Sequence, residues 1–483
     1  MSGYYIENFG CRATQADGAA LERQFEEQGI SRASTAAQAS VVVMNTCTVT
    51  AGADQDARAA IRRVRRQNPK AQIVVTGCYA QRAPQEIAAL PGVRLVIGNS
   101  HKHQLAEIVG HTRTPDLGRE TSNNAFVPLA VLKAPSGSQG PIFVSDIFAH
   151  TELLAAPVFD AANERTRPNL KVQDGCDNRC SFCVIPFVRG QSRSLSIERI
   201  VNEVNGLVAS GYREVVISGI NLGRWGRDLN GYHTPLTNSD DVVWKPSAES
   251  PKPDLPSLIR TILAETALEK LRISSVEPMD WTDDLISLVA SSPRIAKHAH
   301  VPMQSASDAV LRRMHRKYRP WHYREKIEKI RNAMPTTAIG ADVMVGFPGE
   351  SDAEFEATRR MIEDLPFTYL HVFTYSARPG TPAAAMPNQV PIHLARERNK
   401  ILRELASEKK FAFMRGFIGK EVDAITLNVI GTNAAGEFTE ALTDNYLKLR
   451  LQGRHEPNRW LRARIEEVQD GVLVGSLLEL TRY

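Results

Sequence analysis

The chain has 483 residues, of which 42% are hydrophobic and 23% are charged, and its formal net charge is +5. This composition is typical of a folded, water-soluble protein with two or three domains, and the weak basic charge permits nucleic-acid binding without indicating it. No apolar run of about 18 residues predicts a membrane span, and the first residues lack the basic and then apolar pattern of a signal peptide. We therefore expect a cytoplasmic protein without a membrane anchor.

Residues 1–112 alternate between short apolar runs and helical patterns. Strands that alternate with helices are typical of parallel sheets, so we expect an open parallel α/β domain of the flavodoxin-like type. The predicted strands cover residues 4–9, 41–44, 73–75 and 94–97.

Three cysteines, Cys11, Cys47 and Cys78, each lie just past the carboxyl end of a predicted strand. Ligands of open parallel sheets bind at that edge, so residues dozens of positions apart can converge there. The alternative is that these are ordinary buried cysteines, since cysteine is among the most buried residue types. Three such placements out of three favour convergence on one site.

Residues 113–165 are irregular and are predicted to be a linker with one or two strands, at 127–132 and 142–144. Between 166 and 405 the alternation resumes, and its six strand–helix units favour a partial (β/α)6 barrel over a closed eightfold one. The six predicted strands are 170–173, 214–218, 271–275, 298–301, 339–345 and 369–375. A long polar insertion at 226–253 predicts a surface loop.

A loop after the first strand of this barrel carries Cys176, Cys180 and Cys183 in the spacing C-x3-C-x2-C. Active sites of such barrels lie at the carboxyl ends of the strands. Three thiolates on one loop suit an iron–sulfur cube, which four cysteines commonly hold, and they leave one iron open to a small molecule. The alternatives are a zinc site with a remote fourth ligand or unrelated buried thiols.

The C-terminal region, 406–483, is predicted to be a small all-β barrel of the OB type, because short strands follow one another there. The predicted strands are 422–428, 437–443, 446–451, 460–468 and 472–480. Between Lys448 and Arg464 basic residues far outnumber the one acidic residue, Glu456, and Tyr446 and Trp460 flank them. Basic residues with aromatic neighbours suit RNA binding; a solvated strand face with core aromatics is the alternative.

The C-x3-C-x2-C loop closely resembles that of radical S-adenosylmethionine (SAM) enzymes. Together with the early cysteines and the small barrel, it makes the whole chain resemble the radical-SAM methylthiotransferases, whose C-terminal module is a TRAM domain. The motifs that carry the resemblance are Phe9-Gly10-Cys11, Asn45-Thr46-Cys47, Thr76-Gly77-Cys78, Val184-Ile185-Pro186, Val301-Pro302-Met303-Gln304, Gly346-Phe347-Pro348-Gly349-Glu350 and Thr443-Asp444-Asn445-Tyr446.

The resemblance implies two [4Fe-4S] clusters as well as SAM. Cys176, Cys180 and Cys183 would hold the cluster that cleaves SAM, and Cys11, Cys47 and Cys78 the auxiliary one. A general base cannot remove the hydrogen of a C–H bond that is not acidic. A radical that abstracts the hydrogen atom is therefore needed. The family also needs an electron donor and a sulfur donor, which the sequence does not identify.

Known substrates of the family are N6-threonylcarbamoyladenosine and isopentenyladenosine, both at position 37 of tRNA, and an aspartate of ribosomal protein S12. The chain looks most like the threonylcarbamoyladenosine type, on the motifs 189–194, 218–223 and 272–277. A hypothesis of another class is a zinc-stabilised RNA-binding protein without catalysis.

Eight further residues are candidates on weaker grounds, and simple turn or packing roles are the alternatives. Predicted SAM contacts are Phe182, Gly219, Asn221, Ser275, Gln304 and Asp342. Predicted substrate contacts are Arg189 and Arg193, because the planar guanidinium suits phosphate and carboxylate groups.

Overall fold

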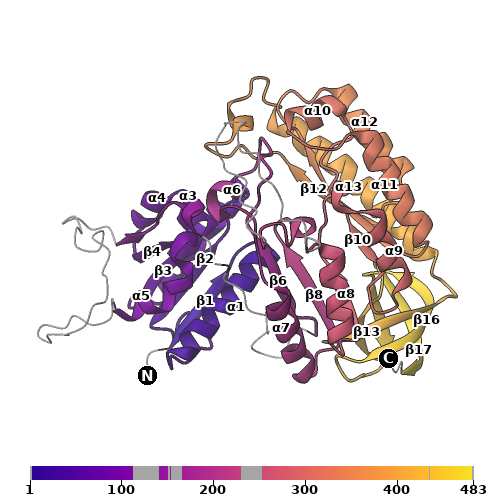
Figure 1. Ribbon diagram of the computed structural model, residues 1–483, viewed down its shortest axis with the longest axis horizontal. Coiled ribbons are helices and arrows are strands. Elements are labelled where there is room, and N and C mark those ends of the chain that lie inside the picture. The colour runs from indigo at the N-terminus through magenta and orange to yellow at the C-terminus, as the bar shows by residue number, and fades with distance from the viewer. Residues whose placement is uncertain are drawn as a thin grey trace, which may run out of the picture. The chain divides into compact units, whose positions relative to one another are not determined.

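The computed structural model describes residues 3–111, 141–150, 153, 166–229, 253–433 and 436–480. The chain forms two compact units (Figure 1). The first comprises Met1–Val158, Gly175–Asn178 and Cys183–Gln191, and the second comprises Phe159–Asp174, Arg179–Phe182 and Ser192–Tyr483. The cysteine loop at 176–183 therefore contributes residues to both units.

The first unit contains a five-stranded parallel sheet. Its strands, in spatial order, are β1 (Tyr4–Asn8), β2 (Val41–Thr46), β3 (Gln72–Gly77), β4 (Val93–Gly98) and β5 (Ile142–Phe143). Its helices are α1 (Arg12–Glu27), α2 (Ala51–Gln67), α3 (Cys78–Arg82), α4 (Pro84–Ala88), the 3-10 helix η1 (Asn99–Gln104), α5 (Leu105–His111), η3 (Ile147–Ala149) and α6 (Ile185–Arg189).

Both faces of this sheet are covered. The run 41–44 is fully buried, as expected for a parallel strand between two helical layers. Ile61 and Val64 of α2 pack on one face, and Leu21 and Phe25 of α1 pack on the other. Apolar residues at helical spacing thus explain both layers.

Two details of this unit differ from the prediction. The strands run in sequential order, whereas the flavodoxin-like order places the second strand at the edge, beside the first; the flavodoxin-like assignment is therefore wrong, and the open parallel α/β sheet is confirmed. The segment Ile142–Phe143, expected in a linker, extends the sheet by pairing with β4. The other expected linker strand, 127–132, lies outside the described residues.

The second unit contains six parallel strands that match the six predicted ones. In one sheet are β6 (Asn169–Asp174), β8 (Glu214–Gly219) and β9 (Lys270–Ile273), with the antiparallel β7 (Arg193–Ser194) at the edge; in the other are β10 (His298–His300), β11 (Ala338–Val345) and β12 (Tyr369–Thr374). Backbone hydrogen bonds join the segments around β9 and β10, including Val276 N to His300 O at 3.1 Å.

Helices separate these strands, as the alternation predicted. They are α7 (Ile197–Ala209), α8 (Leu255–Glu265), α9 (Asp283–Ser291), α10 (Asp308–Arg313), α11 (Pro320–Ala333), α12 (Asp352–Asp364) and α13 (Ile392–Arg415), with the short 3-10 helices η4 (Leu222–Arg224), η5 (Pro278–Asp280) and η6 (Pro382–Ala385). The predicted insertion at 226–253 falls mostly outside the described residues.

The C-terminal strands close into a barrel, drawn in yellow in Figure 1. They are β13 (Glu421–Asn433), β14 (Gly436–Thr443), β15 (Lys448–Gln452), β16 (Trp460–Gln469) and β17 (Val472–Leu480), in the order β13-β14-β15-β17-β16. Leu449 and Leu451 of β15 face the core with Ala463 and Ile465 of β16, which is the alternation of a half-buried strand. Trp460 is 1% exposed, so it is a core aromatic.

A buried ion pair lies where the barrel meets the parallel strands of the second unit. The Nε of Arg272 donates to Oε1 of Glu214 at 2.6 Å, and its Nη1 donates to the backbone oxygen of Asp444 at 3.1 Å. Both partners of the pair are inaccessible to solvent. Burial alone would raise the pKa of Glu214, but Arg272 and Arg167 outweigh it and lower that pKa.

We expect Glu214→Gln to destabilise the protein strongly, because it leaves the Arg272 charge buried without its carboxylate; such losses cost about 3–5 kcal/mol. Glu269→Gln is the control, since the Arg213–Glu269 pair is partly exposed and such pairs contribute about 0–1 kcal/mol. Thermal denaturation measures the loss of stability in each variant. Equal decreases in melting temperature for Glu214→Gln and Glu269→Gln would contradict the prediction. Because the pKa of Glu214 is lowered, its contribution is present at neutral pH and is lost as the pH falls through that lowered pKa.

Candidate functional site

The three early cysteines lie at one edge of the sheet in the first unit. Cys11 directly precedes α1, Cys47 directly follows β2, and Cys78 is the first residue of α3 after β3. Because β1, β2 and β3 are adjacent and parallel, their carboxyl ends meet at the same edge. The structure therefore brings these three residues together, as predicted.

Gly10 allows the close approach of two of the loops that carry these cysteines. Its φ is +100°, which favours glycine. A Cβ added there would lie 2.6 Å from Cβ of Cys47 and 2.8 Å from its Sγ. The loop before α1 can thus pass directly over Cys47 only without a side chain at residue 10.

The thiols interact electrostatically. Burial, with a smaller contribution from the neighbouring sulfurs of Cys78 and Cys11, raises the pKa of Cys47 to about 12 against the opposing effects of the Val49 backbone and Arg189. A bound metal reverses this preference, because a coordinating thiol loses its proton. Asn99 Nδ2 also donates to Sγ of Cys78 at 3.6 Å. Three soft sulfur donors within interaction range fit an iron–sulfur cluster.

Two buried cations lie behind these cysteines and share one carboxylate. Lys102 Nζ and Arg189 Nη2 contact Oδ2 of Asp17 at 3.0 and 2.9 Å, and all three side chains are at most 4% exposed. Burial lowers the pKa of Lys102 and Arg189 lowers it too, against the opposing effects of Asp17 and the sulfur of Cys78. The basic groups of Lys102 and Arg189 thus lie close to these sulfurs. Sequence reasoning missed Asp17 and Lys102, since nothing in their spacing marks them.

The central cysteine loop presents three partly exposed sulfurs, each with an N–H donor. Sγ of Cys176 accepts from the backbone N of Asn178 at 3.4 Å, and Sγ of Cys183 accepts from the backbone N of Ile185 at 3.5 Å. In the second unit, Arg316 Nη1 donates to Sγ of Cys180 at 3.3 Å. Hydrogen bonds to sulfur tune the potential of iron–sulfur clusters, so these contacts also fit such a group.

Arg316 is a residue that sequence reasoning missed. It is buried, and it is ion-paired with Glu277. Burial alone would lower its pKa, but Tyr318, Glu277 and Cys180 raise it well above the ordinary value. A permanent positive charge therefore lies beside the sulfur of Cys180.

Gly219 and Asn221 lie at the carboxyl end of β8, as predicted. The backbone N of Asn221 donates to Oε1 of Gln173 at 2.8 Å, and a Cβ at Gly219 would come within 2.7 Å of the same oxygen. Nε2 of Gln173 donates to Oγ of Ser192 at 2.9 Å. Gln173, which the prediction did not single out, thus holds the ends of β6 and β8 together.

Phe182 packs edge-on against Phe347, with ring centroids 6.4 Å apart, beside Val310 and Met314. Such packing was the alternative to a SAM contact, and the two are compatible because Phe182 stays partly exposed.

The two candidate arginines are both buried. Arg189 belongs to the Asp17 cluster, and Arg193 lies on β7, opposite Asp174. Their substrate role stays a prediction.

Ser275 and Gln304 follow the carboxyl ends of β9 and β10, whereas Asp342, expected at or near a strand end, lies within β11. The backbone N of Gln304 donates to the backbone oxygen of Asp342 at 2.8 Å, while Ser275 Oγ is hydrogen-bonded to Nδ1 of His300. Burial alone would raise the pKa of Asp342, but the hydrogen bond with His371 and the nearby imidazole of His300 outweigh it and hold that pKa well below its usual range. Sequence reasoning missed both histidines.

Comparison with known proteins identifies the family. Residues 3–98 match the family described as uncharacterized protein family UPF0004, and residues 170–362 match the radical SAM superfamily. The threonylcarbamoyladenosine tRNA methylthiotransferase MtaB of Aquifex aeolicus is 35% identical, over 95% of this chain and 99% of the relative. MtaB of Bacillus subtilis is 33% identical, over 94% and 92%. The chain belongs to the radical SAM tRNA methylthiotransferases.

Other relatives within this family differ in their names. The tRNA-2-methylthio-N(6)-dimethylallyladenosine synthase of Endomicrobium trichonymphae is 31% identical, over 98% of this chain and all of the relative. Among solved structures, the radical SAM methyltransferase TsrM of Kitasatospora setae has a TM-score of 0.52 at 15% identity, over 80% of this chain and 75% of that one. This likeness shows a shared fold.

As a methylthiotransferase of this family, the protein is an enzyme whose cofactors are SAM and two [4Fe-4S] clusters. Among the described residues, no helix combines the length and apolar character of a membrane span.

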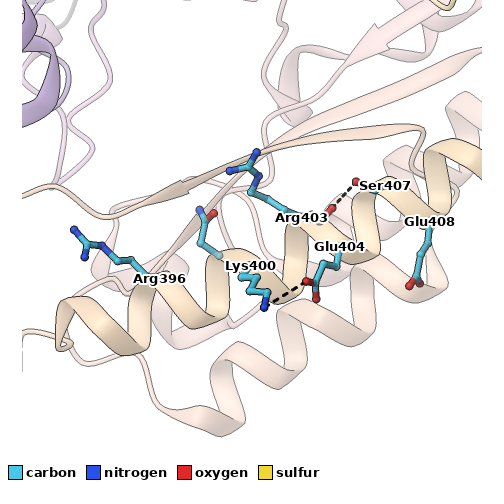
Figure 2. Close-up of a pocket in the computed structure, with 7 residues that line it drawn as sticks. Arg396, Lys400, Arg403, Glu404, Ser407 and Glu408 are labelled. Atoms are coloured by element: carbon cyan, nitrogen blue, oxygen red, sulfur yellow. Dashed lines mark hydrogen bonds and ion pairs between the residues drawn. The ribbon is translucent and has the colours of Figure 1, made fainter. Parts of the chain in front are cut away.

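A hollow on the outer face of α13 (Figure 2) is lined by Arg396, Asn399, Lys400, Arg403, Glu404, Ser407 and Glu408. These residues repeat every three or four positions on one helix and include none of the candidate site residues.

We expect Gly10→Ala to impair the early-cysteine site, because the added Cβ collides with Cys47 and the positive φ disfavours alanine. The iron content after anaerobic reconstitution should fall from about eight per chain toward about four, since a cube holds four irons. The control is Gly29→Ala, which also has a positive φ, +71°, but no atom within 4 Å of the added Cβ. Equal iron loss in both variants would show that strain, and not the contact with Cys47, is responsible.

Proposed function

We propose that the protein transfers a methylthio group to C2 of N6-threonylcarbamoyladenosine at position 37 of tRNA. The observation that carries the proposal is the second set of thiols, Cys11, Cys47 and Cys78, at one edge of the first unit's sheet. SAM cleavage needs only the C-x3-C-x2-C loop, so a further sulfur site indicates sulfur insertion. The adenosine type follows from the names of the MtaB relatives, which are 33–35% identical.

In this proposal, Cys176, Cys180 and Cys183 hold the cluster that cleaves SAM, and Cys11, Cys47 and Cys78 hold the auxiliary cluster. When bound, these groups supply the radical and the sulfur. The chain's own residues position and tune them: Arg316 places a cation beside Cys180, and Lys102 and Arg189, which share Asp17, place basic groups near Cys78 and Cys47. Phe182, Gly219 and Asn221 are proposed to contact SAM, as are Ser275, Gln304 and Asp342.

We assign the domains as 1–112 for the auxiliary cluster, 113–165 for a linker that contributes β5 to the first unit's sheet, 166–405 for a partial (β/α)6 radical SAM core and 406–483 for an OB-like TRAM domain. The closed five-stranded barrel supports the last assignment. Because Trp460 is buried, it has no face on which a base could stack. The barrel is therefore proposed to bind tRNA through its basic residues and the phosphate backbone.

A profile of modified nucleosides tests the substrate. In a strain that lacks the protein, we expect the 2-methylthio derivative of threonylcarbamoyladenosine to disappear and the unmodified nucleoside to accumulate, as measured by mass spectrometry of digested tRNA. Loss of the methylthio group only from the isopentenyl (dimethylallyl) nucleoside, or only from the aspartate of protein S12, would refute the choice of substrate. Complementation with the intact gene is the control.

Two cysteine variants test the division of labour. Cys180→Ala should abolish SAM cleavage under reducing conditions, because one ligand of the SAM-cleaving cluster is lost. Cys47→Ala should retain SAM cleavage within about twofold and lose methylthio transfer. SAM cleavage is followed as release of 5′-deoxyadenosine. Equal loss of SAM cleavage in both variants would contradict the assignment of the cysteines to two separate clusters. Zinc without iron in the reconstituted wild type would contradict the proposed radical SAM activity.

A further inference from the structure

Three metal-binding side chains converge on one face of the sheet formed by β10, β11 and β12. They are His300, the last residue of β10, Asp342 of β11, and His371 of β12. Asp342 is paired with His371 in the strand register, and His300 is paired with Gly340, two residues before Asp342. Side chains two residues apart on a strand share a face, so the sheet itself directs the three groups to one place.

His300 is oriented as metal-binding histidines commonly are. Its side chain is 8% exposed, and its Nδ1 is hydrogen-bonded to Oγ of Ser275. Its Nε2 is buried without a hydrogen bond among the described residues and faces Oδ1 of Asp342 at 3.4 Å. A ligating histidine usually donates its other N–H to such a partner, which fixes the ring and leaves the second nitrogen for the metal.

The spacing of the donor atoms matches a metal coordination sphere. Nε2 of His300 and Nδ1 of His371 lie 3.4 and 3.2 Å from Oδ1 of Asp342, and all three ligand atoms lie within 4.8 Å of one another. Donors about 2.0–2.1 Å from a zinc ion are separated by roughly 3.0–3.5 Å in octahedral or tetrahedral geometry.

Charge also favours a cation. The donor set contains the carboxylate of Asp342 and no cationic lysine or arginine. His371 is 55% exposed, which provides a route for an ion from solvent. The neighbouring His298 differs, because its Nε2 is already hydrogen-bonded to the hydroxyl of Tyr369 at 2.7 Å.

We propose that His300, Asp342 and His371 bind a divalent first-row transition metal ion, zinc or ferrous iron. Two histidines and one carboxylate are a common donor set for both metals. No cysteine takes part, so this site is separate from both proposed clusters. Three protein donors leave at least one position for water or for an oxygen of a bound small molecule. Ser275, proposed above as a SAM contact, supports His300 through its hydrogen bond to Nδ1.

The test uses the full-length protein after anaerobic cluster reconstitution, with ZnCl2 as the probe. The protein is equilibrated with zinc and a competing chelator and desalted, and its zinc and iron are measured by mass spectrometry. We expect one zinc per chain in addition to about eight irons, with iron unchanged. His371→Ala, at an exposed position, and Asp342→Asn should each weaken zinc binding at least tenfold, and Ser275→Ala about tenfold. The matched control His298→Gln should bind zinc as the wild type does.

Three results would overturn the proposal. One is zinc binding that His371→Ala and Asp342→Asn leave unchanged; another is an equal loss in His298→Gln. The third is zinc that enters only as iron leaves, which would place it on the cysteines. A diffraction experiment at the zinc absorption edge adds a direct readout: an anomalous peak between the two histidines supports the site, and its absence from zinc-loaded crystals refutes it. Neither measurement depends on methylthio transfer, so the outcome is independent of the proposed function.

Discussion

Parallel strand pairing is the constraint on which the candidate sites depend. Because neighbouring parallel strands end at the same edge, residues that are far apart in the chain become neighbours there. Cys11, Cys47 and Cys78 meet in this way in the first unit, although more than thirty residues separate each from the next. In the second unit, the register of parallel strands, and not their ends, brings His300, Asp342 and His371 together.

Several buried charged side chains in this protein are paired with side chains of opposite charge. Burying ionised groups is expensive unless partners offset the loss of water, and three buried clusters among the described residues follow that rule. Lys102 and Arg189 share Asp17 behind the early cysteines. Arg316, beside Cys180, is paired with Glu277, and Arg272 is paired with Glu214 near the C-terminal barrel. The first two arrangements leave positive charge close to sulfur, where an anionic cluster benefits from it.

Many of the helices and strands could be predicted because their sequence patterns are local. Apolar runs such as Val41–Met44 and the helical spacing of Leu21 and Phe25 require no knowledge of distant contacts. The order of the strands was less accessible: the sequential order of β1 to β5 depends on which strands pair, and alternation alone does not specify this. The pairing of Ile142–Phe143 with β4 was missed for the same reason, since the two segments are separated by more than forty residues.

The sequence by itself determined the cysteine chemistry and the kinds of module. The spacing of Cys176, Cys180 and Cys183 is a local property of one loop, and the position of each early cysteine at a strand end follows from the pattern around it. Only the tertiary structure decided which side chains surround those sulfurs. Arg189 proved to be buried against Asp17, Trp460 to be a core residue, and Arg316 to be the partner of Cys180. Burial and pairing between distant segments are set by packing, and no spacing along the chain encodes them.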